Sequence, residues 1–173
     1  METVIKKAKG FVEQKFKKAG RIPRHPFRVG LLLEDDFRVE DEEIIAAGFL
    51  HDILEDTSTT KSELKDNFNE RIADIVSELT HPKDMTGLAR TKFYRHLITI
   101  SPEAKLIKIA DLIDSLNLMI SIYDGQKDGT YPDFKDNGKY LKFLKDFYAS
   151  CSDGLPKNSL KIVIDKFESV LGS

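Results

Sequence analysis

The chain has 173 residues, of which 40% are hydrophobic and 32% are charged, and its formal net charge is −2. This is the composition of one folded domain with a single core, and it excludes a disordered protein. The balanced charge gives no support to general nucleic-acid binding, so we expect no nucleic-acid partner. A single cysteine, Cys151, excludes an internal disulfide and suggests a reducing compartment. Because no apolar run approaches the roughly 20 residues that cross a bilayer, and no secretory signal opens the chain, we expect a cytoplasmic protein without a membrane partner.

The charges are unevenly distributed along the chain. Residues 1–28 hold nine basic and two acidic side chains, a net of +7, and residues 34–56 hold ten acidic and one basic, a net of −9. This pattern fits a metal held by carboxylates beside a binding surface for an anion. Two solvated helix faces of opposite charge would give the same pattern, and charge alone favours this second interpretation.

The hydrophobic pattern is helical nearly throughout, and no segment alternates convincingly with period two, so the sequence predicts an all-α fold. Apolar residues at helical spacing predict a first helix over 4–16, and the same period continues through 27–37. Residues 39–56 predict one strongly amphipathic helix with acidic residues in its first turn.

End signals locate the later helices. Thr60 followed by Glu63 is the pattern of a capping box. The next helix, 69–80, ends before Pro82. Ser101 followed by a proline is a typical start for the next long helix.

The C-terminal part begins with a Gly/Asp-rich loop and continues into two predicted closing helices, near 139–150 and 158–171. We therefore divide the chain into a core, residues 1–123, and a helical extension, residues 124–173, packed on the same domain.

The stretch AAGFLHDILEDTS carries four ionisable side chains within six positions, namely His51, Asp52, Glu55 and Asp56. Such groups are costly to bury unless something pairs with them. On one regular helix all four would fall within a single arc. Imidazole plus carboxylate suits Mn²⁺, Fe²⁺ or Zn²⁺ better than Ca²⁺. The alternative for Glu55 and Asp56 is a solvated helix end.

Two further positions are candidates to complete a metal site. His25 precedes a proline that starts a helix, a rigid entry that would aim its imidazole inward. Asp111 lies at the edge of an apolar stripe in LIKIADLIDSL, where a carboxylate requires a cation. The other two histidines, His81 and His96, are expected outside the metal shell. His81 is expected to end a helix, with contact to substrate as the lesser alternative, and His96 is expected at the surface or at its boundary.

The order His25, His51-Asp52, Asp111 resembles the H…HD…D pattern of the HD-domain metallophosphohydrolase superfamily. The block HDILEDTSTTKSELKDNF is similar to the HDxxEDT…F block of the RelA/SpoT-type hydrolase domains, which remove the 3′-pyrophosphate of guanosine tetraphosphate (ppGpp). Four shorter stretches of this chain also resemble that family. FKKAG is similar to the family's FRKSG, and HPFRVG is similar to its HPxxVA. SELTHPK is similar to its VTK, and LIKIADLIDSL is similar to its LIKLADRLHNM. The resemblance runs from about residue 11 to 120.

The resemblance implies an all-α HD-domain helical bundle with a central metal site, and residues 1–123 as its hydrolase core. Position by position it implies metal ligands, catalytic residues and nucleotide-contacting basic residues in this chain. The implied ligands are His25, His51, Asp52 and Asp111, the catalytic pair is Glu55 and Asp56, and the basic pair is Lys17 and Lys18. The implied cofactor is a divalent metal, with Mn²⁺ as the first expectation and Fe²⁺, Co²⁺, Zn²⁺ or Mg²⁺ as alternatives.

Three departures from the family pattern concern substrate rather than metal. The family's PYI is shortened to Ile22-Pro23-Arg24, Ser115 replaces an Asn, and Asn117 replaces an Arg. Ser115 and Asn117 are therefore candidate substrate contacts of altered chemistry. The basic residues expected to neutralise a polyphosphate are Lys17, Lys18, Arg21 and Arg24. For Arg21, an exposed helix end is an equal alternative.

The leading hypothesis is a metal-dependent phosphohydrolase that hydrolyses the 3′-pyrophosphate of ppGpp or a related alarmone through a metal-bound water. The alternative within enzymes is an HD-domain nucleotidase or nucleotide phosphohydrolase that acts on another phosphoester. A third hypothesis is a non-catalytic HD domain that binds a nucleotide. The partner in each case is a small nucleotide, and a homodimer stays open.

Overall fold

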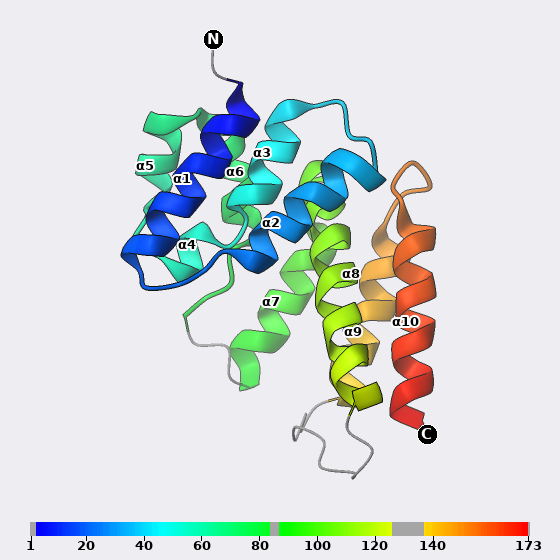
Figure 1. The fold of residues 1–173 in the computed structure, drawn as a ribbon. Helices are drawn as coiled ribbons and strands as arrows, with labels where there is room; N and C mark the ends of the chain where they lie inside the picture. The colour runs from blue at the N-terminus through cyan, green and yellow to red at the C-terminus, as the bar shows by residue number, and fades with distance from the viewer. Residues whose placement is uncertain (1–2, 84–86, 126–136, 173) are drawn as a thin grey trace. The chain divides into compact units, whose positions relative to one another are not determined.

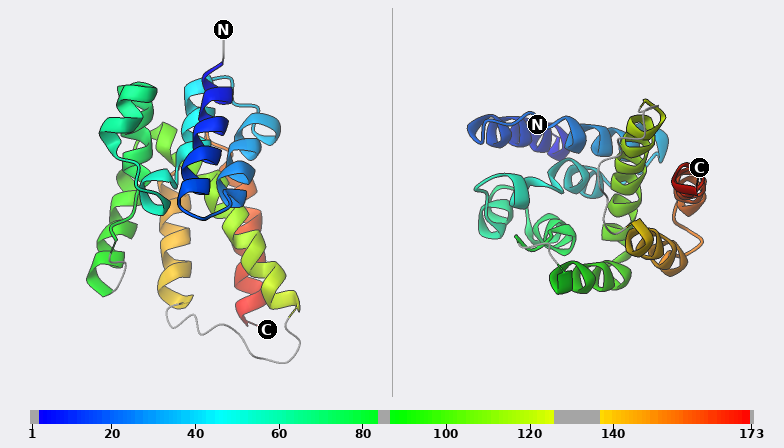
Figure 2. Two further views of the ribbon diagram at one scale, coloured as in Figure 1. Left: turned by 60° about the vertical axis from the view of Figure 1, so that its left-hand side comes forward. Right: turned by 90° about the horizontal axis from the view of Figure 1, so that it is seen from below.

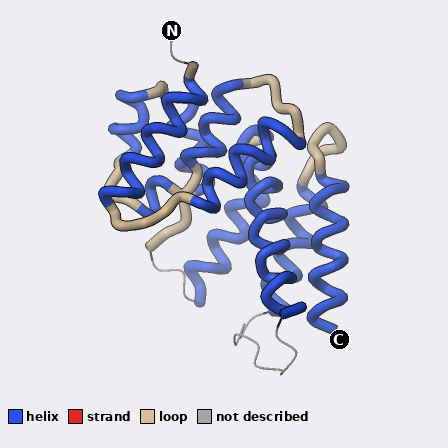
Figure 3. The backbone as a smooth tube through the Cα atoms, in the orientation of Figure 1, coloured by secondary structure: helices blue, strands red, loops and turns tan. Residues whose placement is uncertain are grey.

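The computed structural model describes residues 3–83, 87–125 and 137–172 (Figure 1). Across these ranges every regular element is a helix (Figure 3), which confirms the all-α prediction. The chain forms two compact units, Met1–Lys108 and Ile109–Ser173, which we describe separately. These units divide within one helix, and the predicted organisation as a core of 1–123 with 124–173 packed on it stays a prediction.

The first unit contains most of the helices. They are α1 (Val4–Lys18), α2 (Arg24–Leu31), a π-helical turn η1 (Leu32–Asp36), α3 (Glu42–Leu50), α4 (Ile53–Asp56), α5 (Lys61–Asn67), α6 (Glu70–Leu79) and α7 (Gly87–Thr99). Helix α3 lies between α1 and α2 on one side and α6 on the other (Figure 2). Seven consecutive residues of α3, from Ile44 to Leu50, are buried, so this helix is the centre of the unit.

The predicted caps form where the sequence places them. Thr60 Oγ1 accepts a hydrogen bond from the backbone N–H of Glu63 at 3.2 Å, and Ser101 Oγ accepts one from Ala104 at 3.2 Å. Each bond satisfies one of the amide groups that a helix start leaves without a backbone partner. The start of α8 (Pro102–Gly125) is thereby confirmed.

The predicted single helix over 39–56 is wrong in one respect, because the helix breaks in its middle. Helix α3 ends at Leu50 and α4 begins at Ile53. Asp52 has φ −92° and ψ −1°, outside regular α-helical values, and it serves as the N-cap of α4. Neighbouring side chains on a regular helix diverge by about 100°. The break therefore changes how His51 and Asp52 are aimed.

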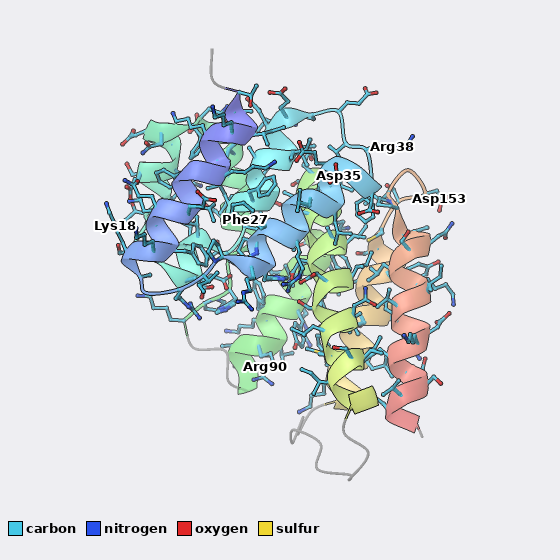
Figure 4. All side chains as sticks on the ribbon, viewed as in Figure 1. Lys18, Phe27, Asp35, Arg38, Arg90 and Asp153 are labelled. Atoms are coloured by element: carbon cyan, nitrogen blue, oxygen red, sulfur yellow. The ribbon has the colours of Figure 1, made fainter. Side chains whose placement is uncertain are left out.

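The helix predicted over 27–37 also differs in the structure. Helix α2 begins at Arg24, so His25 lies inside the first turn of the helix rather than before it. Pro26 is tolerated there, because the backbone N–H that proline lacks has no hydrogen-bond partner in the first turn of a helix. After Leu31 the chain widens into η1, and Arg38, labelled in Figure 4, then adopts a positive φ of 52°. That conformation ends the helical path and turns the chain toward α3.

The sequence predictions give no bounds for helix α7, although they expect helical structure nearly throughout. Its buried side chains are Phe93 and Leu97, one turn apart, and its other positions are polar or partly exposed. Two apolar anchors make too short a stripe for the pattern to show.

The second unit holds the rest of α8 together with α9 (Asn137–Ser150) and α10 (Lys157–Gly172). Helices α9 and α10 pack together through Tyr140 and Phe167, whose rings meet edge to face at 6.2 Å. Both closing helices are confirmed, and most of the predicted loop, residues 126–136, lies outside the described residues. Among the described helices, none has the length and apolar content that a membrane crossing requires.

Candidate metal centre and hydrolytic site

His51 is the most buried of the predicted site residues, with 4% of its side chain exposed. It follows the last residue of α3, and its Nδ1 lies 2.8 Å from the carbonyl oxygen of Gly48. A carbonyl oxygen only accepts, so Nδ1 carries the ring proton and, in the neutral ring, Nε2 presents a lone pair. A backbone carbonyl bound to one ring nitrogen is the usual support for a histidine whose other nitrogen ligates a metal.

His25, His51 and Asp52 converge on one place. His51 Nε2 lies 3.3 Å from His25 Nε2 and 3.1 Å from Asp52 Oδ1, and His25 Nε2 lies 3.8 Å from Asp52 Oδ2. The two imidazole rings meet edge to face, with centroids 5.1 Å apart. The break between α3 and α4 lets Asp52 turn its carboxylate toward the same point as the preceding histidine.

The spacing of these three groups fits a metal ion. Their ligand atoms all lie within 4.8 Å of one another. Two ligand atoms bound at right angles to one ion, each at about 2.1 Å, lie about 3 Å apart. Two imidazoles and a carboxylate form a donor set typical of Mn²⁺, Fe²⁺ or Zn²⁺. The group is thus able to hold a divalent ion.

Asp111, the fourth predicted ligand, lies on α8 in the second unit. It is 9% exposed, and its Oδ1 accepts a hydrogen bond from Ser115 Oγ at 3.3 Å. Ser115 is one turn further along the helix, and Asn117 is exposed. The role of Asp111 as a ligand, and of Ser115 and Asn117 as substrate contacts, stays a prediction.

Glu55 lies on α4 with only 14% of its side chain exposed. Burial raises the pKa of this carboxyl to about 7, and the negative charge of Asp52 adds to the increase. A backbone hydrogen bond from His81 and the positive charges of His81 and Lys108 act in the opposite direction. A carboxyl group with a pKa near neutrality can both take and return a proton at physiological pH.

Asp56, the other predicted catalytic residue, forms an ion pair with Arg21 Nη1. Arg21 comes from the loop between α1 and α2, so it joins that loop to α4. The sequence left open whether Arg21 meets a ligand or solvent, and in the structure it meets Asp56.

An open cavity of about 610 Å³ lies beside this loop. Its lining residues are Glu13, Lys17, Gly20, Arg21, Ile22, Pro23, Arg24 and Phe27. Three of the four predicted phosphate-binding residues, Lys17, Arg21 and Arg24, therefore line this cavity. Lys18 lies exposed at the end of α1 (Figure 4) and does not line this cavity. Arg24, which lines the cavity, is followed in the sequence by His25, one of the two histidines of the candidate metal site.

Sequence reasoning missed one residue of this site, His81. Its backbone N–H donates to Glu55 Oε1 at 2.6 Å, and its Nε2 lies 2.8 Å from Oε2 of the same carboxyl group. The two residues are 26 positions apart, so no local spacing pattern reveals the contact. The other histidine, His96, binds the carbonyl oxygen of Glu78 at 2.9 Å.

The fold and the His–Asp group together define a class, an all-helical protein with a group of side chains that could hold a divalent metal. A family model described as HD domain matches residues 23–116, more than half of the chain. The chain belongs to the HD domain family.

Sequence comparison finds relatives over part of this chain. It is 34% identical over 119 residues to a zebrafish (Danio rerio) protein named guanosine-3′,5′-bis(diphosphate) 3′-pyrophosphohydrolase MESH1, a match that covers 67% of this chain and 66% of that protein. The Xenopus tropicalis MESH1 is 33% identical over 93 residues, covering 53% of this chain and 52% of the relative. An Aquifex aeolicus protein named guanosine-3′,5′-bis(diphosphate) 3′-pyrophosphohydrolase is 36% identical over 111 residues. This match covers 62% of this chain and 16% of that protein. The matches thus span about half to two thirds of the MESH1 proteins and less of the bacterial one.

Structure comparison extends the likeness of the fold along the chain. A solved structure described as a metazoan ortholog of SpoT that hydrolyzes ppGpp superposes with a TM-score of 0.76 and 20% sequence identity. The superposition covers 99% of this chain and 97% of that one. The shared fold therefore continues beyond the segment that the family model matches.

Proposed function

We propose that this chain is a metal-dependent phosphohydrolase that removes the 3′-pyrophosphate of ppGpp or a related alarmone. The observation that carries the proposal is the group of His25, His51 and Asp52, together with the carboxyl group of Glu55 on the next helix, whose side chain is 14% exposed. The relatives named for ppGpp hydrolysis supply the substrate class.

The proposed metal ligands are His25, His51, Asp52 and Asp111, and the proposed ion is Mn²⁺. A divalent ion at such residues lowers the pKa of water and polarises a phosphoryl oxygen. His51 contributes Nε2 because Gly48 fixes the proton on Nδ1. Asp52 contributes a carboxylate whose Oδ1 lies 3.1 Å from His51 Nε2.

Glu55 is the proposed proton acceptor. Water has to lose a proton as its oxygen attacks phosphorus, and a carboxylate with a pKa near 7 accepts that proton at physiological pH. The second carboxylate of the pair, Asp56, follows Glu55 in the chain and forms an ion pair with Arg21. We assign it a role in orienting water or substrate.

The substrate's phosphates are proposed to bind the basic residues at the end of α1 and the start of α2. Lys17 and Arg24 line the cavity of about 610 Å³, and its remaining wall includes the apolar side chains of Ile22 and Phe27. Guanidinium and ammonium groups on a partly apolar wall suit a molecule with a charged and an aromatic part. Lys18, Ser115 and Asn117 are further proposed contacts.

The altered substrate positions motivate a second candidate function. Asn117 stands where the resembled family has an Arg, and Ser115 is hydrogen-bonded to Asp111. A different set of substrate contacts with the same metal ligands would give a phosphohydrolase that acts on another nucleotide. A non-catalytic nucleotide-binding domain ranks third, since every implied ligand and the Glu55-Asp56 pair are present.

A substrate panel separates these candidates. The purified protein is loaded with Mn²⁺ and given ppGpp and nucleoside mono-, di- and triphosphates, with released pyrophosphate and phosphate measured separately. The alarmone hydrolase releases pyrophosphate from ppGpp and leaves GDP. Release of phosphate from another nucleotide, with ppGpp intact, would replace it with the second candidate. Tight nucleotide binding without turnover under Mn²⁺, Mg²⁺, Co²⁺ or Fe²⁺ would favour the third. The proposed location is the cytoplasm.

A further inference from the structure

His81 contacts both oxygens of the Glu55 carboxyl group. Its backbone N–H reaches Oε1 at 2.6 Å and its imidazole Nε2 reaches Oε2 at 2.8 Å. Only 14% of the Glu55 side chain is exposed, and two partners from one residue leave its carboxyl group little freedom to rotate. The contact joins the end of α6 to α4.

The local chain holds His81 in the orientation that this contact needs. Helix α6 ends at Leu79, and Pro82 restricts the preceding residue, His81, to extended backbone. His81 Nδ1 lies 2.8 Å from the carbonyl oxygen of Pro82. A carbonyl only accepts, so Nδ1 carries a proton and the ring has a fixed tautomer.

That tautomer decides what lies between His81 and Glu55. With Nδ1 protonated, a single further proton bridges Nε2 and Oε2. Phe93 of α7 meets the His81 ring edge to face, with centroids 6.2 Å apart, and so limits its movement on another side. The ring is therefore held by a backbone carbonyl, an aromatic ring and the carboxyl group together.

We propose that His81 is a positioning residue for hydrolysis, which holds the carboxyl group of Glu55 in the orientation that receives the proton of the attacking water. This inference rests on the proposed phosphohydrolase function, and it holds for any nucleotide that the chain hydrolyses. It assigns a role to a histidine outside the metal ligands. A proton acceptor works only when its oxygen atom is within hydrogen-bonding reach of the proton that it takes, so a residue that orients the acceptor contributes to the rate.

The first test compares His81→Ala, His81→Gln and Glu55→Gln in steady-state kinetics. We expect His81→Ala to lower kcat about tenfold or more with KM changed less than about threefold, because a residue that acts through Glu55 affects proton transfer more than substrate binding. The backbone N–H survives the substitution, so the loss should be smaller than that of Glu55→Gln. His81→Gln keeps an N–H donor near the position of Nε2 and should recover a good part of kcat.

His96→Ala is the matched control. His96 also neighbours Phe93, at 6.2 Å between ring centroids, but it binds the Glu78 carbonyl instead of a site carboxylate. Its kcat should equal that of the wild type. Urea unfolding of each variant shows whether a loss of activity reflects a loss of folded protein.

A double-mutant cycle between His81 and Glu55 supplies a second readout that a structural role alone would not produce. We expect coupling between the two substitutions both in the unfolding equilibrium constant and in kcat. Coupling in unfolding with independent effects on kcat would overturn the inference and leave the proposed function intact. So would an active wild type with an unchanged His81→Ala variant. A wild type that hydrolyses no nucleotide would overturn the proposed function, and this inference with it.

Discussion

The backbone carbonyl of Gly48 accepts a hydrogen bond from Nδ1 of His51 at 2.8 Å. The same glycine lies against Leu33, since a Cβ added to it would come 2.2 Å from Leu33 Cδ1. One residue therefore connects the packing of α3 in the core with the orientation of a proposed metal ligand.

Gly48→Ala should destabilise the protein by about 1–3 kcal/mol, the usual cost of overpacking a core. Leu33 is fully buried and has to move to admit the new methyl group. Urea unfolding measures the change. Gly10→Ala is the control, because a Cβ there meets nothing within 4 Å, and in the interior of α1 it should stabilise by about 0.5–1 kcal/mol. Equal stability of the Gly48→Ala variant and the wild type would contradict the close contact.

Removing the metal should lower the thermal stability of the wild type. An ion present at 100 times its dissociation constant stabilises the folded state by about 2.7 kcal/mol, which corresponds to roughly 5–10 °C in Tm for a chain of this size. Differential scanning calorimetry with and without a chelator measures the shift. His51→Ala should show no shift, whereas His96→Ala should keep it. An identical shift in His51→Ala would place the ion elsewhere.

Glu55→Gln should abolish activity and yet stabilise the metal-free protein at pH 8. Burial raises the pKa of Glu55 in the folded state to about 7, so the folded protein holds a proton that the unfolded chain releases near its ordinary value of 4.5. The free energy of unfolding of the wild type therefore falls as pH rises from about 4.5 to 7. A pKa shift of this size corresponds to a loss of about 3 kcal/mol, and the uncharged Gln side chain of the variant avoids this loss. Unfolding curves of both proteins at pH 5 and pH 8 measure it. A difference that is the same at both pH values would be inconsistent with the raised pKa.

Arg71 should stabilise the protein in a pH-dependent way. It donates to Asp41 at 2.7 Å and to Glu43 at 2.8 Å, and its side-chain hydrogen bond, together with backbone N–H groups at the start of α3, lowers the pKa of Asp41. A lowered folded-state pKa gives stability that is present above the unfolded value of about 3.9 and is lost as pH falls through the folded value.

The effect is small because both side chains are well exposed. Arg71→Leu should cost at most about 1 kcal/mol at pH 7, with the cost shrinking below pH 4. Arg95→Leu, at an exposed position of α7, is the control and should change little at either pH. A cost for Arg71→Leu that stays constant down to pH 2.5 would exclude the ion pair as its source.

Much of the fold was accessible from sequence because its signals are local. The capping residues Thr60 and Ser101 and the closing helices follow from hydrogen bonds and apolar spacing within a few residues. The break at Asp52 could not be found this way, since the residues on either side continue the helical pattern. The bounds of helix α7 were not predicted, because this helix is stabilised mainly by the tertiary packing of Phe93 and Leu97, and its sequence shows little apolar periodicity.

Some contacts of the candidate site were likewise accessible from the sequence, and others were not. The proximity of His25 to His51 and Asp52 was expected from their order and context, and the structure brings these three together. The contact of His81 with Glu55 depends on where α6 ends relative to α4, which only the packed structure provides.

The most direct test of the account is a crystal structure of the Mn²⁺-loaded protein with anomalous scattering data for manganese. The account predicts one strong anomalous peak within about 2.3 Å of Nε2 of both His25 and His51 and of a carboxylate oxygen of Asp52, with Asp111 completing the coordination. A peak at other residues, or an ion bound by these three with Asp111 turned away from it, would contradict it.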